Sequence, residues 1–283
     1  MKAYLLFLAP FALACSMTGN EQKIKELATL SLDEVSGMEY SQSSNLIWTL
    51  QDKGNESLLY GLNREGNIKR ELLIDIDNKD WESLAADAEG NLYIGDFGNN
   101  DNERKDLAIY RISKTDLGEE RAKVAATINF KYPEQKDYPP KKTERFYDCE
   151  AFYEYNGNFY LFTKNRSSDS DGTFYVYQVP NKEGNHSARL IGRLKTCGDK
   201  SCQITGADIS PDGAKVVLIS EDKVYVLTNF SANDFGQAKM EIINLGHSSQ
   251  KEGICFTGNK TLLLTDERTK KSGGYLYELS LQN

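Results

Sequence analysis

The sequence contains little histidine, and it lacks the short motifs of several enzyme classes. Only two histidines, His186 and His247, occur in 283 residues, and no GxSxG, HExxH or phosphate-loop pattern is present. These absences argue against a nucleophile-elbow hydrolase, a zinc protease and a phosphate-binding loop. His186 lies in a polar loop, and a bystander role is favoured over general-base chemistry for His247. No motif indicates a catalytic residue.

Cysteine is scarce as well, and its spacing excludes the common thiolate zinc sites. The chain has five cysteines and no CxxC pair. Cys149 and Cys255 lie in apolar segments, where a thiol behaves as a small buried hydrophobic group. Cys197 and Cys202 flank a turn-like Gly-Asp-Lys-Ser spacer. They form either a small disulfide loop or two free thiols on a loop.

Positive charge is in deficit across the chain. Lysine and arginine number 34 against 42 acidic residues, which gives a formal net charge of −8. Nucleic acid is therefore not an expected partner, whereas divalent cations and cationic ligands suit such a surface. Solubility alone also accounts for this charge.

Long apolar runs are missing after the first fourteen residues. Lys2 and the apolar run 3–14 have the form of a secretory signal, and this run is too short to span a bilayer. It ends in Ala-Leu-Ala-Cys15, which resembles a bacterial lipobox. Ala12 stands where leucine is usual, so ordinary secretory cleavage is the alternative.

This N-terminal pattern predicts the domain organisation and the location of the protein. We expect a signal peptide at 1–14, a lipidated Cys15, a polar tether at 15–22 and one domain at 23–283. The protein would be exported to the bacterial cell envelope, on the periplasmic or surface side, and would touch the membrane only through its lipid. Export also makes an oxidising compartment, and hence a disulfide, the expectation.

The rest of the chain is rich in alternating apolar and polar runs separated by Gly, Asn and Asp turns, which predicts an all-β fold. The runs repeat in five units, and the first strand of each unit is SGMEYS, ESLAAD, EAFYEY, TGADIS or EGICFT. Four units have four strands, and the last ends after three. The surplus run KIKELATLSL (23–32) precedes the first unit and matches the missing strand.

This match predicts a β-propeller of four-stranded antiparallel blades, closed by the N-terminal strand completing the last blade. We predict five blades, with six as the alternative. The segment 132–146 is rich in proline and charge and has no strand pattern, so it is expected to be a long loop. Trp81 is expected to pack between neighbouring blades.

Antiparallel pairing places the start of each first strand and the end of each second strand on one face of the ring. The first strands begin at Ser36, Glu82, Glu150, Thr205 and Glu252. Small residues follow at Gly37, Ser83, Ala151, Gly206 and Gly253. These small residues would let the inner strands approach closely around a narrow channel.

The ends of the second strands add further charged and amide side chains to this face, at Asp52, Asp96, Lys164, Glu221, Asp266 and Glu267. Calcium prefers carboxylate and amide oxygens, and the predicted metal ligands are Glu82, Asp96, Glu150, Glu252 and Asp266. The predicted ligand-binding residues are Asn99, Asn100, Lys164, Arg166 and Arg268. The alternative is that Lys164, Arg166 and Arg268 only neutralise the carboxylates as an ion-pair network.

Several of these segments resemble a family of envelope propeller lipoproteins from Bacteroidetes-type bacteria. The resemblance rests on DWESLAADAEGNLYIGDFGNN, YLFTKNR, ADISPDG, KEGICF and LLLTDE, and it covers nearly all of the mature chain. More distantly, the chain is similar to the calcium-dependent propellers of the gluconolactonase, strictosidine-synthase-like, SdiA-regulated and phytase-like esterase groups. That resemblance implies acidic and Asn metal ligands at the channel mouth, at positions matched by Glu82, Glu252, Asp96 and Asp266. Those groups mostly have six blades, whereas this chain has five repeats.

Two functions from different classes follow. The first is a monomeric ligand- or partner-binding propeller of the envelope, which recognises a small molecule or another envelope protein. The second is a calcium-dependent hydrolase of an ester, lactone or phosphoester. Because no nucleophile or well-placed histidine is evident, the sequence favours binding. Sugar recognition by the many tyrosines is a weaker third hypothesis.

Overall fold

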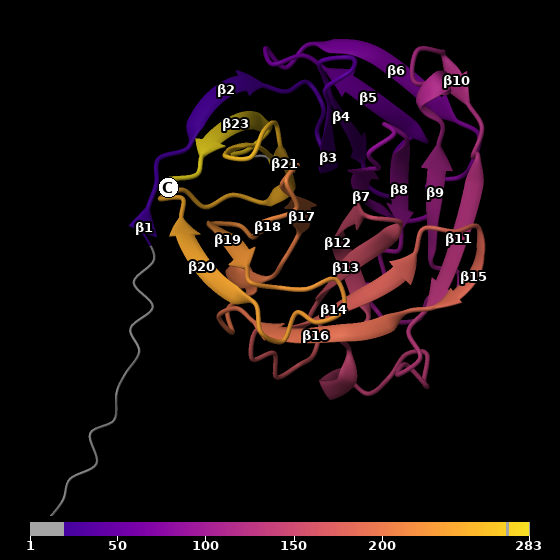
Figure 1. Cartoon of the computed structure of the whole chain (residues 1–283), viewed down its shortest axis with the longest axis vertical. Helices are drawn as coiled ribbons and strands as arrows, with labels where there is room; N and C mark the ends of the chain where they lie inside the picture. Colours follow the sequence, from indigo (N-terminus) through magenta and orange to yellow (C-terminus); the bar gives the residue numbers. More distant parts are fainter. Residues whose placement is uncertain (1–19, 270–271, 283) are drawn as a thin grey trace, which may run out of the picture.

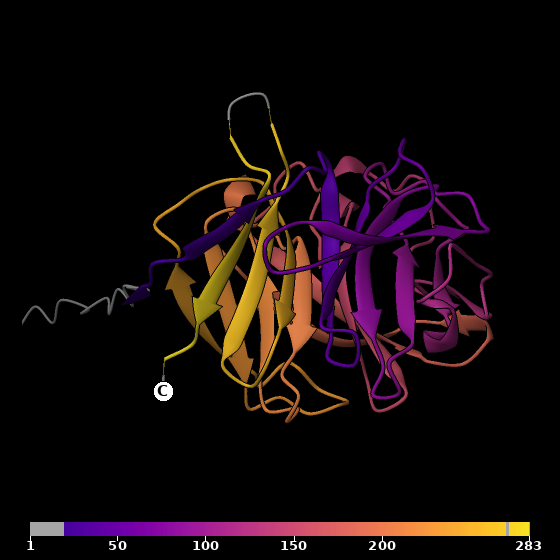
Figure 2. The ribbon, with the colours of Figure 1, turned by 90° about the horizontal axis from the view of Figure 1, so that it is seen from above.

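The computed structural model describes residues 20–269 and 272–282, which form five sheets arranged in a ring (Figure 1). Each sheet is one blade, and its strands lie side by side in order from the centre of the ring to its outside. The prediction of a five-bladed propeller is confirmed. Figure 2 shows the ring from the side, with the blades as neighbouring sheets.

The first three blades follow one another along the chain. Blade 1 consists of β3 (Val35–Ser41), β4 (Leu46–Gln51), β5 (Leu58–Leu62) and β6 (Ile68–Ile74), with the short β10 (Arg121–Ala122) on its outer edge. Blade 2 consists of β7 (Trp81–Ala86), β8 (Leu92–Asp96), β9 (Ala108–Ile112) and β11 (Ala126–Lys131), with β15 (Gly184–Ser187) outside. Blade 3 consists of β12 (Asp148–Tyr155), β13 (Asn158–Lys164), β14 (Thr173–Pro180) and β16 (Arg189–Lys195).

The last two blades use strands from both ends of the described chain. Blade 4 consists of β17 (Gly206–Ile209), β18 (Val216–Ile219), β19 (Lys223–Thr228) and β20 (Lys239–Asn244), with β1 (Asn20–Glu21) outside. Blade 5 consists of β21 (Lys251–Phe256), β22 (Thr261–Asp266), β23 (Tyr275–Ser280) and β2 (Lys25–Thr29).

The ring closes in blade 5, as the repeat predicted. Strand β2 pairs antiparallel with β23, and Lys25 lies opposite Glu278 while Thr29 lies opposite Tyr275. The preceding residues, which we expected to be tether, also pair: Asn20 lies opposite Ile243 of β20 in parallel register. Closure therefore joins the two ends of the domain through backbone hydrogen bonds, and the described end of the tether belongs to blade 4.

The connection before blade 3 is a loop, as predicted. Between Tyr132 and Phe146 the backbone forms one short 3₁₀ helix, η2 (Lys142–Glu144), and no strand. Two other 3₁₀ helices lie in connections, η1 (Lys114–Asp116) after β9 and η3 (Lys200–Cys202) before blade 4. No sixth blade is present among the described residues.

Hydrophobic side chains fill the interfaces between the blades. Five clusters of buried residues correspond to the five interfaces. Trp81 is fully buried and packs in the cluster that also contains Trp48 and Leu50 of blade 1. The predicted inter-blade position of Trp81 is confirmed.

The inner strands contact one another closely at small residues. A methyl group on Gly37 would lie 2.5 Å from Ser83 Cα, and one on Gly206 would lie 3.2 Å from the carbonyl oxygen of Glu252. Side-chain hydroxyls tie neighbouring inner strands together, since Ser36 Oγ donates to the Glu82 carbonyl at 2.7 Å. The expectation that small residues permit a narrow centre holds at these contacts.

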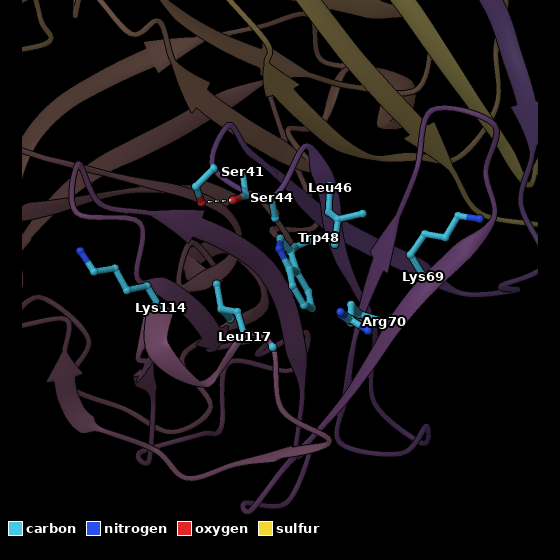
Figure 3. Close-up of a pocket in the computed structure, with 10 residues that line it drawn as sticks. Ser41, Ser44, Leu46, Trp48, Lys69, Arg70, Lys114 and Leu117 are labelled. Atoms are coloured by element: carbon cyan, nitrogen blue, oxygen red, sulfur yellow. Dashed lines mark hydrogen bonds between the residues drawn. The ribbon is translucent and has the colours of Figure 1, made fainter.

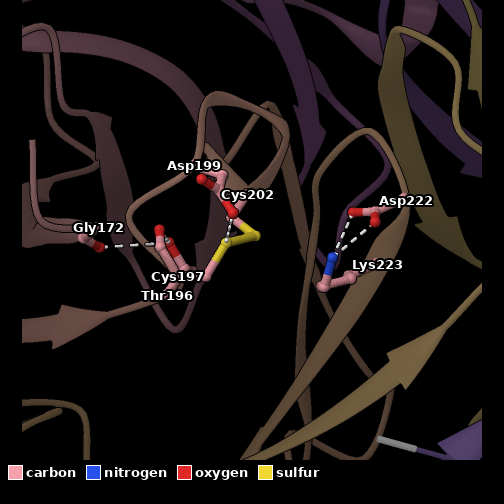
Figure 4. Close-up of a disulfide and its surroundings, with 7 residues drawn as sticks. All are labelled: Gly172, Thr196, Cys197, Asp199, Cys202, Asp222 and Lys223. Carbon is pink, nitrogen blue, oxygen red and sulfur yellow. Dashed lines mark hydrogen bonds and ion pairs between the residues drawn. A yellow bond between two sulfur atoms is a disulfide. The ribbon is translucent and has the colours of Figure 1, made fainter.

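The loop between blades 3 and 4 contains a disulfide between Cys197 and Cys202 (Figure 4). Cys149 and Cys255 are free thiols and fully buried in the inner strands. The signal peptide and the lipidation of Cys15 concern residues outside the described range and stay predictions. Within that range, no helix has the length and apolar character needed to cross a membrane.

The close contact at Gly37 predicts a large loss of stability on substitution. Gly37 has a φ of +62° and no room for a Cβ atom, whereas Gly90 has a φ of +90° and no atom within 4 Å of that position. We expect Gly37→Ala to lower the free energy of unfolding by about 3 kcal/mol and Gly90→Ala by only about 1 kcal/mol. Urea unfolding of both variants measures the difference. Equal losses would show that backbone strain, and not the contact between inner strands, governs this position.

Candidate functional site

Four inner strands carry one extra residue near their start, and in three of them that residue is a glutamate. In blade 2, Trp81 pairs with Asp96 and Ser83 pairs with Gly95, so Glu82 has no partner in the ladder. The same shift leaves out Glu150 in blade 3 and Glu252 in blade 5. Such a bulge bends the strand and redirects the side chain of the extra residue. The three glutamates thus occupy equivalent positions in three blades.

Blade 1 has the same bulge, but its extra residue is Gly37 and not Ser36. Ser36, which the repeat aligned with the glutamates, pairs with Leu50 in the ladder and lines the same cavity as they do. Only the bulged position differs by one residue, which alternation alone does not reveal. Blade 4 shows no such shift in its pairing, and its inner strand begins at Gly206.

The glutamates line a cavity of about 510 Å³ at the end of the ring where the inner strands begin. Its lining consists of Ser36, Asp52, Glu82, Asn100, Glu150, Lys164, Arg166, Gln250, Glu252 and Glu267. Five of these side chains are carboxylic acids and two are cations. The residues come from blades 1, 2, 3 and 5 and from the loops that follow their second strands. Four blades therefore build one shared, acidic site.

Both cations are held by blade 3. Lys164 forms an ion pair with Glu150. Arg166 bridges Asp148 and Glu150, and both of its nitrogen-to-oxygen distances are 2.6 Å. Asp148 also accepts a hydrogen bond from the backbone N–H of Asn99 at 2.7 Å. The ion-pair network that we considered as an alternative therefore exists, and it compensates Glu150.

The other glutamates of the cavity are compensated less, through the more distant attraction of Lys164 and, for Glu252, a hydrogen bond with Gln250. Within the described residues, Glu82, Glu252 and Glu267 form no salt bridge, although Glu82 and Glu252 are at most 9% exposed. Burial, followed by repulsion from Glu150, raises the pKa of Glu82 well above its usual value. Burial also raises the pKa of Glu252 well above its usual value.

The pKa values of two further carboxyl groups of the lining, Asp52 and Glu267, are raised as well. Burial and repulsion from Glu34 raise the pKa of Asp52 to about 6, and burial and repulsion from Asp52 raise that of Glu267 to about 7. The site thus gathers more negative charge than its two cations balance, and it holds protons at pH values where glutamate is normally ionised. A bound cation would relieve this repulsion.

Asp96 and Asp266 lie outside the cavity, although the sequence placed them among the metal ligands. In the strand ladder Asp96 lies opposite Trp81 and Asp266 opposite Lys251, the residues just before the bulges. Glu267 comes one residue later, and successive side chains of a strand point to opposite sides. For this reason Glu267 reaches the cavity while the two aspartates turn away from it.

Both aspartates have internal partners. Asp96 pairs with Arg104 at 2.7 Å, and Asp266 accepts hydrogen bonds from the Tyr277 hydroxyl and the Tyr275 backbone N–H, both at 2.8 Å. Each is fully buried. Both side chains are thus engaged inside their own blades and do not reach the cavity.

Of the five predicted ligand-binding residues, three line the cavity and two lie outside it. Asn100, Lys164 and Arg166 line the cavity. Asn99 is buried, and its side chain donates to the Tyr147 carbonyl at 3.2 Å and accepts from the Arg104 N–H at 2.9 Å, so it fixes the loop. Arg268 donates to the Leu30 carbonyl and lies 3.6 Å from Asp33, away from the cavity.

Sequence reasoning missed Gln250 of the lining and Asp148 behind it. A signal for Asp148 was available, because Asp-x-Glu occurs at 80–82 and again at 148–150, at the start of two inner strands. Asp80 occupies the equivalent place in blade 2, where it pairs with Lys53 at 3.2 Å. Each aspartate forms an ion pair with a cation, and in blade 3 that cation, Arg166, also contacts the bulged glutamate.

The geometry does not present a calcium site. Within the part of the chain that the structure describes, no group of three or more His, Cys, Asp or Glu side chains is arranged to hold a metal ion. Glu150 is already engaged by Lys164 and Arg166. Calcium needs six to eight oxygens at about 2.3–2.6 Å, and the five predicted ligands do not supply them together, because Asp96 and Asp266 lie outside the cavity.

The fold and the cavity together define the class: a five-bladed β-propeller with an acidic axial cavity. No known family model matches the chain, and no curated protein matches it either. Membership of a Bacteroidetes-type envelope family therefore stays a prediction.

Solved structures do show likeness. The PQQ-bound aldose sugar dehydrogenase of Streptomyces coelicolor superposes with a TM-score of 0.56 at 10% identity, over 93% of this chain and 98% of that one. A gluconolactonase from Xanthomonas campestris gives 0.46 at 14% identity, over 91% and 88%. Regucalcin, a calcium-binding protein from Agrobacterium tumefaciens, gives 0.47 at 13% identity, over 93% and 95%. At these identities the likeness concerns the propeller fold alone.

The raised carboxyl pKa values predict how stability depends on pH. The folded state keeps a proton on Glu267 up to about pH 7, whereas the unfolded chain releases it near pH 4.5. This group's contribution to stability is therefore present at low pH and is lost as pH rises through about 7. We expect the stability of the wild type relative to Glu267→Gln to fall between pH 5 and pH 8. Thermal unfolding of both proteins measures it.

Glu65→Gln provides the control for this experiment, because Glu65 is exposed in a turn outside the cavity. Its stability relative to the wild type should vary little over the same range. If the wild type instead became more stable relative to Glu267→Gln as the pH rises, the pKa of Glu267 would not be raised in the folded state.

Proposed function

We propose that this protein is a ligand-binding propeller whose acidic axial cavity binds a small organic cation, such as an amine. The observation that carries the proposal is the imbalance of charge: five carboxyl groups line the cavity with only two cations, and both cations are held by Glu150 and Asp148. Buried carboxylates without a partner are costly, and a cationic ligand would supply that partner.

The size of the cavity supports an organic ligand over a metal ion. A volume of about 510 Å³ lies in the range of small-molecule sites. The carboxyls that lack a cation are spread over blades 1, 2 and 5, at Asp52, Glu82, Glu252 and Glu267. Such a spread suits a ligand that extends across the cavity, with its charged group on the side away from Lys164 and Arg166.

The lining also supports binding over catalysis. It contains no histidine and no cysteine, and its single hydroxyl, that of Ser36, donates to the Glu82 carbonyl. His247 lies elsewhere, beside Lys251, with 3.2 Å between Nδ1 and Nζ. The hydrolase alternative therefore has neither an available nucleophile nor a fitted metal in this cavity.

The location in the envelope belongs to the same proposal. A signal peptide ending before Cys15, with a lipid on that cysteine, would hold the propeller at a membrane surface on the exported side. The disulfide between Cys197 and Cys202 supports an oxidising compartment. Labelling with a radioactive fatty acid, lost in Cys15→Ser, would test the anchor.

Calorimetric titration with putrescine, choline and Ca²⁺ tests the function. We expect an organic cation to bind with release of protons, because binding lowers the raised pKa values of the cavity carboxyls. Glu252→Gln should weaken binding about tenfold or more, since a hydrogen-bonded charge pair is lost. The control Glu65→Gln should bind like the wild type.

A second variant tests the geometry without removing a charge. A methyl group on Gly98 would overlap the Glu82 carboxylate and would lie 2.6 Å from Asp80 Cγ. Gly98→Ala should therefore displace Glu82 and weaken cation binding while the protein stays folded. Binding of Ca²⁺ alone, with loss in Glu252→Gln, would overturn the proposal in favour of the metal-dependent alternative.

A further inference from the structure

A second cavity, of about 490 Å³, lies at the junction of blades 1 and 2 (Figure 3). Its wall is formed by Leu46 and Trp48 of β4, Lys69 and Arg70 of β6, and Lys114 of η1. The turn between β3 and β4 contributes serine hydroxyls on one side. The cavity has no counterpart in the sequence predictions.

The charge of this cavity is opposite to that of the protein as a whole. Three cations line it, Lys69, Arg70 and Lys114, and no aspartate or glutamate does. Within the described residues the side chains of these three cations form no salt bridge. The three side chains are exposed, so they are hydrated here and remain available to an anion that enters the hollow.

The floor of the cavity supplies an independent observation. Trp48 is fully buried, and its indole Nε1 has no hydrogen-bond partner. In Figure 3 the indole lies between Ser44 and Arg70, with its nitrogen on the side of the serine turn. A buried N–H without an acceptor is unfavourable, and an oxygen of a bound molecule would satisfy it once the turn adjusts.

Gly61 keeps the wall of the cavity in this arrangement. A methyl group there would lie 3.1 Å from both Arg70 Cβ and Leu46 Cδ1, and 3.5 Å from the Trp48 ring. The absence of a side chain at Gly61 thus lets the base of Arg70 lie close to the indole. Arg70 and Trp48 therefore line the same part of the cavity, with the indole N–H on the side of the serine turn.

We propose that this cavity binds the phosphate group of a small phosphorylated molecule. Three cations without carboxylate partners suit a dianion, and the planar guanidinium of Arg70 can bind two of its oxygens at once. The Trp48 N–H and the hydroxyls of Ser41, Ser43 and Ser44 provide neutral donors. Leu46 and Leu117 offer apolar contact for the rest of the ligand.

This site is separate from the acidic cavity and does not depend on its function. Strand β3 begins at the acidic cavity near Ser36 and ends at Ser41, which lines the basic cavity. The two cavities therefore lie toward opposite faces of the ring and share no residue. One protein would carry a cation site and an anion site at the two ends of blade 1.

Calorimetric titration at fixed ionic strength with glucose 6-phosphate, inorganic phosphate and glucose tests the proposal. The full mature protein should bind both phosphates and not glucose. The double variant R70Q/K114Q should weaken phosphate binding about tenfold or more. The control K131Q/K239Q removes two exposed cations elsewhere, on β11 and β20, and should leave the affinity unchanged.

Two further variants distinguish binding in this cavity from nonspecific electrostatic attraction to the protein surface. A methyl group on Gly118 of the lining meets no atom within 4 Å, so Gly118→Phe can fill space there without removing a charge. This variant should weaken the binding of glucose 6-phosphate more than the binding of inorganic phosphate. Trp48→Phe should abolish the change in tryptophan emission on binding, since Trp81 does not line this cavity.

The proposal is overturned if neither phosphate binds to a protein whose thermal unfolding is normal. It is also overturned if R70Q/K114Q and K131Q/K239Q lose affinity equally, because that result would show only nonspecific attraction. If glucose binds with the same affinity as glucose 6-phosphate, the phosphate group is not recognised and the proposal is overturned.

Discussion

The close approach of the five inner strands is the constraint on which the rest of the structure depends. A side chain at Gly37 would overlap the neighbouring inner strand at Ser83, and one at Gly253 would overlap Thr265 of its own blade and crowd Met38 of the next inner strand. A side chain at Gly206 would be crowded by Ile219 and by the Glu252 carbonyl. Bulges at Glu82, Glu150 and Glu252 then bring the three carboxylates together at one end of the ring. The packing that closes the propeller thereby creates the acidic cavity.

Concentrating carboxyl groups in this way has an electrostatic consequence. Burial raises their pKa values, and Lys164 and Arg166 compensate chiefly Glu150. The remaining repulsion costs folding energy, and such a cost is typical of a site prepared for a ligand. The basic cavity differs, because its three cations are exposed and its buried group without a partner is the Trp48 N–H. In both cavities the protein leaves polar groups uncompensated where a ligand can supply the missing partner.

Much of the fold followed from the sequence, because strand alternation and the surplus N-terminal strand are local patterns. The three glutamates were also predictable, since they begin equivalent strands. The places of Asp96 and Asp266 were not, because their side chains find partners in Arg104 and Tyr277 outside the cavity, which strand alternation does not reveal. The basic cavity was invisible for another reason: Lys69 and Lys114 belong to different blades, and only the packing of the blades brings them together.

The central claim is that the bulged glutamates share one buried site, in which burial raises the pKa values of Glu82 and Glu252 well above the usual value. Infrared spectroscopy of the ligand-free protein measures this directly, through the carbonyl band of protonated carboxyl groups as a function of pH. The account predicts that part of this band persists to a higher pH than an exposed glutamate allows, and that this part is reduced in Glu82→Gln and in Glu252→Gln and unchanged in Glu65→Gln. Complete ionisation of all carboxyl groups by pH 5.5, with no band lost in either cavity variant, would contradict it.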